Sequence, residues 1–534
     1  MRWPSFLLLA ALLFSVSPSV AQTCTVSWAS ATSGDWNDAS RWTPNQVPGA
    51  ADVACITVDG TYTVTLASGS PSVQDLVLGG ANGTQTLVLN RAFAVGQTAT
   101  IRANGVLNWV SNYITSGAIT NNGLVRLTGT SGSRGVRGTG ASFTNTGTVE
   151  HSSTGSFYVY NTASVSNEGL WDLTGDGDIF GFTGLGTFRN EAGATVRKSG
   201  GSGVSQFGSG GLVVENEGTL DVQTGTVQFN SVSTHTDAVF AVAEAALLFF
   251  SSGGVRFEGT TTGSPQGVVQ LNNPFTVADG AVWNLSGTGM TWTSNYQQEG
   301  ALTNRGLVRL TGTSGSRGVR GTGASFTNAG TVEHSSTGAF YVYDTAEAVN
   351  TSLWDLTGDG DIFGFTSLGT FRNEAGATVR KSGGDAVSQF GSGGLVVENE
   401  GTLDVQTGEV RFDRPSTHTD AAFAVAEDAL LRFNAGGVRF EGTTSGAPEG
   451  TVQLDDEFTA ADGAIWDLGG TGMTWISNYQ EEGALTNRGV VRLTGTSGSR
   501  GVRGAGASFI NAGTVEHSGT GGFFVYDTAE AVNR

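Results

Sequence analysis

Lysine, proline and cysteine are scarce in this 534-residue sequence, and basic charge as a whole is outnumbered by acidic charge. Lys and Arg together number 27 against 47 Asp and Glu, which gives a formal net charge of -20. Binding to nucleic acid needs clustered basic side chains that displace counterions from the phosphates. The composition therefore predicts that nucleic acid is not a partner.

Long apolar runs are missing as well, since no stretch reaches the roughly 18 consecutive apolar residues of a membrane helix. The N-terminus carries Arg2, a shorter apolar run over residues 6–16 and the small residues Ser19 and Ala21. This order is typical of a secretory signal peptide, which we place at residues 1–21. The chain is therefore expected outside the cell or at the cell surface, and not to span a membrane.

The only two cysteines, Cys24 and Cys55, lie close together behind this leader. In an exported protein such a pair predicts a disulfide that fixes the start of the fold. No group of further ligand-type residues accompanies the pair. A metal site is not expected there, and nothing in the sequence indicates a cofactor.

What the sequence has in excess is glycine, with 82 residues, against 9 prolines and 3 methionines. Short runs rich in Val, Thr, Phe and Leu lie between the glycines, a pattern typical of strands separated by turns. The predicted class is all-β. We interpret residues 241–250, the best helix candidate, as strand, turn and strand.

A long repeat organises the chain. The string RLTGTSGSRGVRGTGASFTN at residues 126–145 recurs unchanged at 309–328, and with small edits at 492–511, so the offset is 183 residues. The predicted division is an N-terminal cap with the first coils at 22–104, long repeats at 105–287 and 288–470, and a truncated third copy at 471–534. Because that copy is incomplete, we expect the chain to be part of a longer protein.

A shorter period lies within each long repeat, marked by an N-x-G or N-x-x-G phrase before an alternating apolar strand. In the first copy the glycines are Gly123, Gly147, Gly169, Gly193 and Gly218, spaced by 24, 22, 24 and 25 residues. This period predicts a parallel β-helix, or β-solenoid, with about three strands in each coil of 22–25 residues. The 88 residues from Gly218 to Gly306 predict four more coils.

The corner phrase has a predicted chemistry. Asn and Gly tolerate positive φ, which suits a tight corner. The Asn amide can also form hydrogen bonds to its counterparts in the coils above and below.

Residues 28–58 read WASATSGDWNDASRWTPNQVPGAADVACITV. This segment resembles the Trp-rich, VPG-containing leader that precedes β-solenoid regions in large bacterial surface proteins. The N-x-G coils resemble filamentous-haemagglutinin-type and autotransporter passenger repeats. The resemblance implies a right-handed β-helix that is displayed at the cell exterior, often in adhesion. Trp28, Trp36 and Trp42 are then expected to cover the open end of the first coil. The alternative for these tryptophans is stacking on sugars.

Two kinds of residue are candidates for chemistry. All five histidines, His151, His235, His334, His418 and His517, are copied with their repeats, so we interpret them as surface residues and not as catalytic ones. Asp176 and Asp178, repeated as Asp359 and Asp361, could hold Ca²⁺ or form an acidic turn.

Two further groups are candidates for binding. Six arginines lie among glycines and are predicted to be exposed on a projecting loop: Arg134, Arg137, Arg317, Arg320, Arg500 and Arg503. Phe157 and Val159 share one strand face and are expected to point inward. The tyrosines on the opposite face are then candidates for glycan contact, or for packing beneath a loop: Tyr158, Tyr160, Tyr341, Tyr343 and Tyr526.

Two functions compete at this stage. The first is a non-catalytic structural or adhesin-like rod that binds glycans or other surface proteins through repeated faces, because duplication multiplies weak contacts. The second is a β-helix polysaccharide lyase or glycoside hydrolase, which needs a unique cluster of charged residues. The duplicated charges favour the first.

Overall fold

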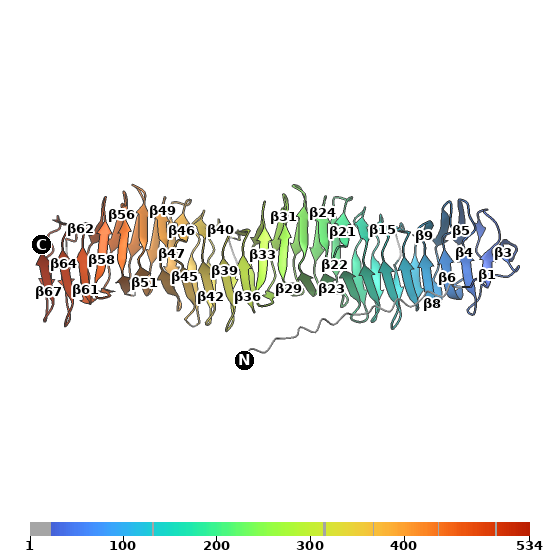
Figure 1. Cartoon of the computed structure of the whole chain (residues 1–534), viewed down its shortest axis with the longest axis horizontal. Coiled ribbons are helices and arrows are strands. Elements are labelled where there is room, and N and C mark those ends of the chain that lie inside the picture. Colours follow the sequence, from blue (N-terminus) through green and yellow to red (C-terminus); the bar gives the residue numbers. More distant parts are fainter. Residues whose placement is uncertain (1–22, 131–132, 313–316, 367, 436, 497–498) are drawn as a thin grey trace, which may run out of the picture.

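The computed structural model describes residues 23–130, 133–312, 317–366, 368–435, 437–496 and 499–534, so the predicted signal peptide lies outside the described residues. These residues form a β-solenoid, a straight rod of about 21 stacked coils (Figure 1). The predicted all-β class and the stacked parallel coils are confirmed. Residues 241–250 form the ends of two strands, β27 (Val239–Val242) and β28 (Leu247–Phe250), joined by a turn.

Each coil contributes one strand to each of three parallel columns, because every strand from β10 to β64 pairs with the strand three places later. Column 1 begins with β10 (Asn112–Thr115), β13 (Arg134–Arg137), β16 (Phe157–Tyr160) and β19 (Ile179–Phe182). Column 2 begins with β11 (Ala118–Asn121), β14 (Ser142–Asn145), β17 (Ser164–Asn167) and β20 (Thr187–Asn190). Column 3 begins with β12 (Leu124–Leu127), β15 (Thr148–His151), β18 (Leu170–Leu173) and β21 (Thr195–Lys198).

Strand alternation builds a single continuous core. Val125, Val149, Trp171 and Val196 occupy the second position of successive column 3 strands, pair in register and are buried. Removing such side chains from water is the main stabilising term of the fold. The buried cluster runs along the rod from Val26 to Phe509.

Asparagine forms a second, polar ladder inside the rod. Asn121 Nδ2 donates to Asn145 Oδ1 at 2.7 Å, and the bonds continue coil by coil through Asn167, Asn190 and Asn216. The second copy repeats the ladder from Asn304 to Asn399. The predicted bonding of these amides above and below is confirmed.

The prediction that the corner glycines adopt positive φ is wrong for Gly123, Gly147, Gly169 and Gly218, and holds at Gly193, where φ is 84°. The reason for glycine at the other corners is close approach of the coils. A Cβ atom on Gly147 would lie 2.3 Å from the Gly123 carbonyl oxygen, and one on Gly169 the same distance from that of Gly147.

The N-terminal end is closed by a small cap. Short strands β1 (Val26–Trp28), β2 (Gly34–Asp35) and β3 (Trp42–Thr43), the 3-10 helix η1 (Ala39–Arg41) and strand β4 (Val53–Ile56) carry it. Its three tryptophan rings are buried, and the Trp42 indole lies edge-on to those of Trp28 and Trp36, with centroids 5.0 and 4.9 Å away. A core role is thus confirmed for them, and burial excludes sugar stacking. Cys24 and Cys55 form the expected disulfide.

Successive long repeats are out of phase with the coil. Equivalent strands differ by 25 in number: β13 corresponds to β38 (Arg317–Val319) and to β63 (Arg500–Val502). Twenty-five strands are eight coils and one strand more, so each copy begins one column later. The 88 residues from Gly218 to Gly306 hold thirteen strands, β24 to β36, which are the four predicted coils and one strand more.

Among the described residues, no helix has the length and apolar character needed to cross a membrane.

Candidate binding surface

The outer face of column 1 carries a cluster of rings that we call patch 1: Tyr113, Arg137, Tyr158, Tyr160, Phe180 and Phe182. These residues lie on β10, β13, β16 and β19, four consecutive coils. The Tyr160 hydroxyl donates to that of Tyr113 at 2.6 Å, across intervening strand β13. Gly135 of β13 pairs with both Tyr113 and Tyr158, and a Cβ atom on it would lie 1.9 Å from the Tyr158 carbonyl oxygen.

Arg137 and Phe182 complete patch 1. The Arg137 guanidinium lies 5.5 Å from the Tyr160 ring centroid and 5.8 Å from that of Tyr113. Phe182 packs against Tyr160 with centroids 5.1 Å apart. Contacts between cations, rings and ring edges of this kind hold aromatic side chains in fixed orientations at a surface.

The second copy has an equivalent cluster, patch 2, on and beside β35 (Asn295–Gln297), β38, β41 (Phe340–Tyr343) and β44 (Ile362–Phe365). Its members are Tyr296, Arg320, Tyr341, Tyr343, Phe363 and Phe365. In the third copy patch 3 consists of Tyr479, Arg503, Phe524 and Tyr526, on and beside β60 (Asn478–Glu482), β63 and β66 (Phe523–Val525).

The predicted tyrosines belong to these patches; in patches 1 and 2 a phenylalanine is more exposed than they are, and in patch 3 Tyr526 is as exposed as Phe524. Phe157 and Val159 point inward as expected, while Tyr158 is half-buried and Tyr160 only 8 % exposed. Burial raises the pKa of Tyr160 well above its usual value, so the phenol keeps its proton. Phe182 and Phe365 are 46 % and 48 % exposed.

Sequence reasoning missed Phe180 and Phe182, and with them Leu185, which is 70 % exposed beyond the end of β19. The sequence phrase IFGF could have indicated them. By the alternation that places Phe157 inside, Ile179 and Gly181 point inward and the two phenylalanines point outward.

The prediction that Arg134, Arg317 and Arg500 are exposed is wrong, since all three are buried. Arg134 lies two residues before inward-facing Val136 and pairs with buried Phe157, so alternation points it into the rod. Its guanidinium donates to the carbonyls of Gly129 at 2.8 and 2.9 Å and of Val110 at 3.1 Å.

The buried arginines are structural. Removal from water lowers the pKa of Arg134 and of Arg317 to about 10, which leaves both protonated at neutral pH. Backbone carbonyl oxygens accept hydrogen bonds from both guanidinium groups. The second arginine of each pair is not buried as the first is. Arg137 and Arg320 are exposed, as predicted, and Arg503 is partly exposed.

The histidines are likewise not surface residues. His151, His235, His334 and His418 are buried, because each lies two residues after an inward-facing Val or Ser; His517, in the last coil, is exposed. Burial lowers the pKa of His151 to about 4 and that of the other three buried rings to about 3. They are therefore neutral at physiological pH.

The two lysines of the chain occupy equivalent inward positions beside the Asp loops. Lys198 Nζ lies 2.8 Å from Asp176 Oδ1 and Lys381 Nζ 2.9 Å from Asp359 Oδ1, and both lysine side chains are fully buried. Asp176 and Asp359 are thus each paired with an ammonium group. Asp178 and Asp361 instead accept from the backbone N–H groups of Gln206 and Gln389. Across the described residues, no three His, Cys, Asp or Glu side chains are grouped to hold a metal ion.

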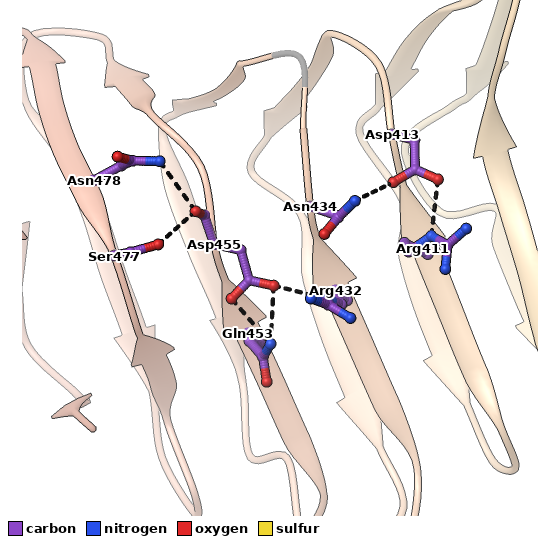
Figure 2. A network of polar contacts seen from close by, with 8 residues as sticks. All are labelled: Arg411, Asp413, Arg432, Asn434, Gln453, Asp455, Ser477 and Asn478. Carbon is purple, nitrogen blue, oxygen red and sulfur yellow. Dashed lines mark hydrogen bonds and ion pairs between the residues drawn. The ribbon is translucent and has the colours of Figure 1, made fainter. Parts of the chain in front are cut away.

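The second copy differs from the first in a polar network on β50 (Glu409–Phe412), β53 (Leu430–Phe433), β56 (Thr451–Leu454) and the turns that follow them (Figure 2). Arg411 pairs with Asp413 at 2.8 Å and Arg432 with Asp455 at 2.5 Å. The first copy has uncharged residues at these four positions: Gln228, Asn230, Phe249 and Asn272. Such partly exposed pairs contribute little to stability.

No protein-family model, curated protein or solved structure matches this chain.

Proposed function

We propose that this chain is a non-catalytic, extracellular structural rod of the adhesin-like kind, which binds neutral glycans through its aromatic patches. The observation that carries the proposal is the recurrence in each copy of one surface arrangement of tyrosines and an arginine with an exposed phenylalanine beside them. Ring faces pack on the C–H faces of sugars, while hydroxyl and guanidinium groups donate hydrogen bonds to sugar oxygens.

Several features support the location and the absence of catalysis. The signal-like leader and the Cys24–Cys55 disulfide suit an oxidising, extracellular compartment. The resemblance of the coils to bacterial surface repeats points the same way. The buried histidines are neutral, and Asp176 is paired with Lys198, so neither group is arranged as an acid or base facing solvent.

Patch 1 and patch 2 can be removed together by the substitutions Tyr158→Ala, Phe182→Ala, Tyr341→Ala and Phe365→Ala. On an array of neutral glycans we expect the wild-type chain to bind and this variant to lose at least about 10-fold in signal, because each ring contact contributes on the order of 1 kcal/mol.

The matched control is Arg432→Phe, which gives the second copy the residue that the first has at Phe249 and leaves the patches intact. It should bind like the wild type. Equal binding by the patch variant would contradict the proposal, and so would release of new reducing ends or unsaturated sugars from a bound polysaccharide.

A further inference from the structure

The spatial relation between the patches follows from the phase of the repeat. Patch 1 lies on column 1, patch 2 on column 2 and patch 3 on column 3, because each copy begins one strand later. If the columns ran straight along the rod, the three patches would point in directions a third of a turn apart. A partner on one side could then reach only one of them.

The columns do not run straight. In Figure 1, β24 (Thr219–Val222) and its equivalent β49 (Thr402–Val405) both lie along the upper side of the rod, although β24 belongs to column 3 and β49 to column 1. On the lower side lie two further equivalent pairs, β36 (Ala301–Asn304) with β61 (Ala484–Asn487) and β42 (Glu347–Asn350) with β67 (Glu530–Asn533).

For equivalent strands of successive copies to share a side, each column must wind around the rod by about a third of a turn in every copy. Spread over eight coils and one strand, this is roughly 14° per coil, which lies within the range of twist between neighbouring strands of a sheet. The extra strand of each repeat moves equivalent residues to the next column, and the winding of the columns offsets that rotation. The repeat length thus returns equivalent surfaces to the same side of the rod.

With this winding the three patches fall in one line along the rod. With about 4.8 Å between coils, consecutive patches are separated by roughly 40 Å along the axis. Each patch is itself elongated in that direction, since the rings of patch 1 come from four consecutive coils and span roughly 14 Å of the axis.

Building on the glycan binding proposed above, we infer that the rod holds a single linear polysaccharide parallel to its axis, with the patches as successive subsites of one track. The elongated shape of each patch favours a chain running along the rod over branch tips that approach it end-on. A polymer held at one subsite meets the next at a high effective concentration, so its affinity exceeds that of a short oligosaccharide.

The test measures binding of the full-length protein to tetrasaccharides and to polysaccharides long enough to span two patches. Both are taken from linear β-glucan, mannan, xylan and chitin. We expect the bound polymer to have an affinity at least about 100-fold higher than its tetrasaccharide. A variant that removes only patch 2, Tyr341→Ala with Phe365→Ala, should lose at least about 10-fold in polymer affinity. For the tetrasaccharide it should lose binding sites without a change in Kd.

The outcomes separate the two proposals. If tetrasaccharide and polymer bind equally well, or if the patch 2 variant affects both alike, the track is wrong while glycan binding stands. If none of the four polymers binds, both proposals fail. If removing patch 2 instead changes the oligomeric state measured by light scattering, the patches are contacts between rods, and the track is contradicted.

Discussion

The rod is expected to lose several kcal/mol of unfolding free energy when the pH falls from about 7.5 to about 4.5. In the unfolded chain an imidazole takes up a proton as the pH falls below about 6.5. His151 resists protonation down to about pH 4, and His235, His334 and His418 down to about pH 3. Between these limits the unfolded state binds more protons, so stability decreases as the pH falls.

The physical cause is burial, since an imidazolium inside the rod has lost its hydration. Near His334 the positive charges of Arg317 and Lys381 add to that penalty, as those of Arg134 and Lys198 do near His151. Each histidine is expected to contribute about 2 kcal/mol to the loss, or several kcal/mol for the four together.

The contribution can be isolated with the double substitution His235→Phe and His418→Phe. The His235 ring lies among those of Phe229, Phe250 and Phe257, so a phenylalanine ring matches its surroundings. The variant also loses the contacts of Asn216 and Asn399 with the two imidazoles, so the comparison is of the change with pH and not of the stability itself. Thermal and denaturant unfolding at both pH values should show about half of the wild-type loss in the variant. An unchanged loss would mean that carboxylates, and not the buried histidines, set the acid sensitivity.

Asn145→Ala is expected to lower the unfolding free energy by about 3 kcal/mol. The Asn145 amide donates to Asn167 Oδ1 at 2.7 Å and to the Leu170 carbonyl at 3.0 Å, and accepts from Asn121. Alanine would leave Asn121 Nδ2, Asn167 Oδ1 and the Leu170 carbonyl, in the two coils on either side, without these bonds. Each unmade buried bond costs roughly 1–3 kcal/mol.

The damage should be local along the rod, because a coil contacts only its neighbours. Amide hydrogen exchange is therefore expected to accelerate in the coils around Asn145 and to stay unchanged near Asn399. Asn122→Ala is the matched control, since Asn122 is exposed and its side chain only accepts from Thr146. If both variants unfold alike, the ladder does not stabilise the fold.

Much of the architecture could be predicted from the sequence, because the coil is a local pattern. The N-x-G phrase marks the corner of each coil, and alternation assigns Val149 and Phe157 to the interior. The same alternation assigns Arg134 and His151 to the interior too. The sequence favours the surface for both side chains because charged and titratable groups are stabilised by water. Only the structure shows the backbone carbonyl oxygens to which they form hydrogen bonds inside the rod.

Two properties could not be predicted in this way. The glycine at the corner is required by the distance to the next coil, which depends on how coils stack and not on the local φ of Gly147. The alignment of the patches depends on the sheet twist, a property summed over eight coils that no single residue encodes. Once the strand count of a repeat is known, however, the twist that aligns its copies follows.

That alignment is tested most directly by measuring the distances between the three patches. Spin labels are attached to the substitutions Arg137→Cys, Arg320→Cys and Arg503→Cys, two at a time, in the protein with its disulfide intact. The three distances are then measured by pulsed electron resonance in deuterated protein. Collinear patches predict two distances of roughly 40 Å and a third equal to their sum. If the patches instead spiral around the rod, both short distances will be nearer 50 Å and the third will fall well short of their sum, which would contradict the account.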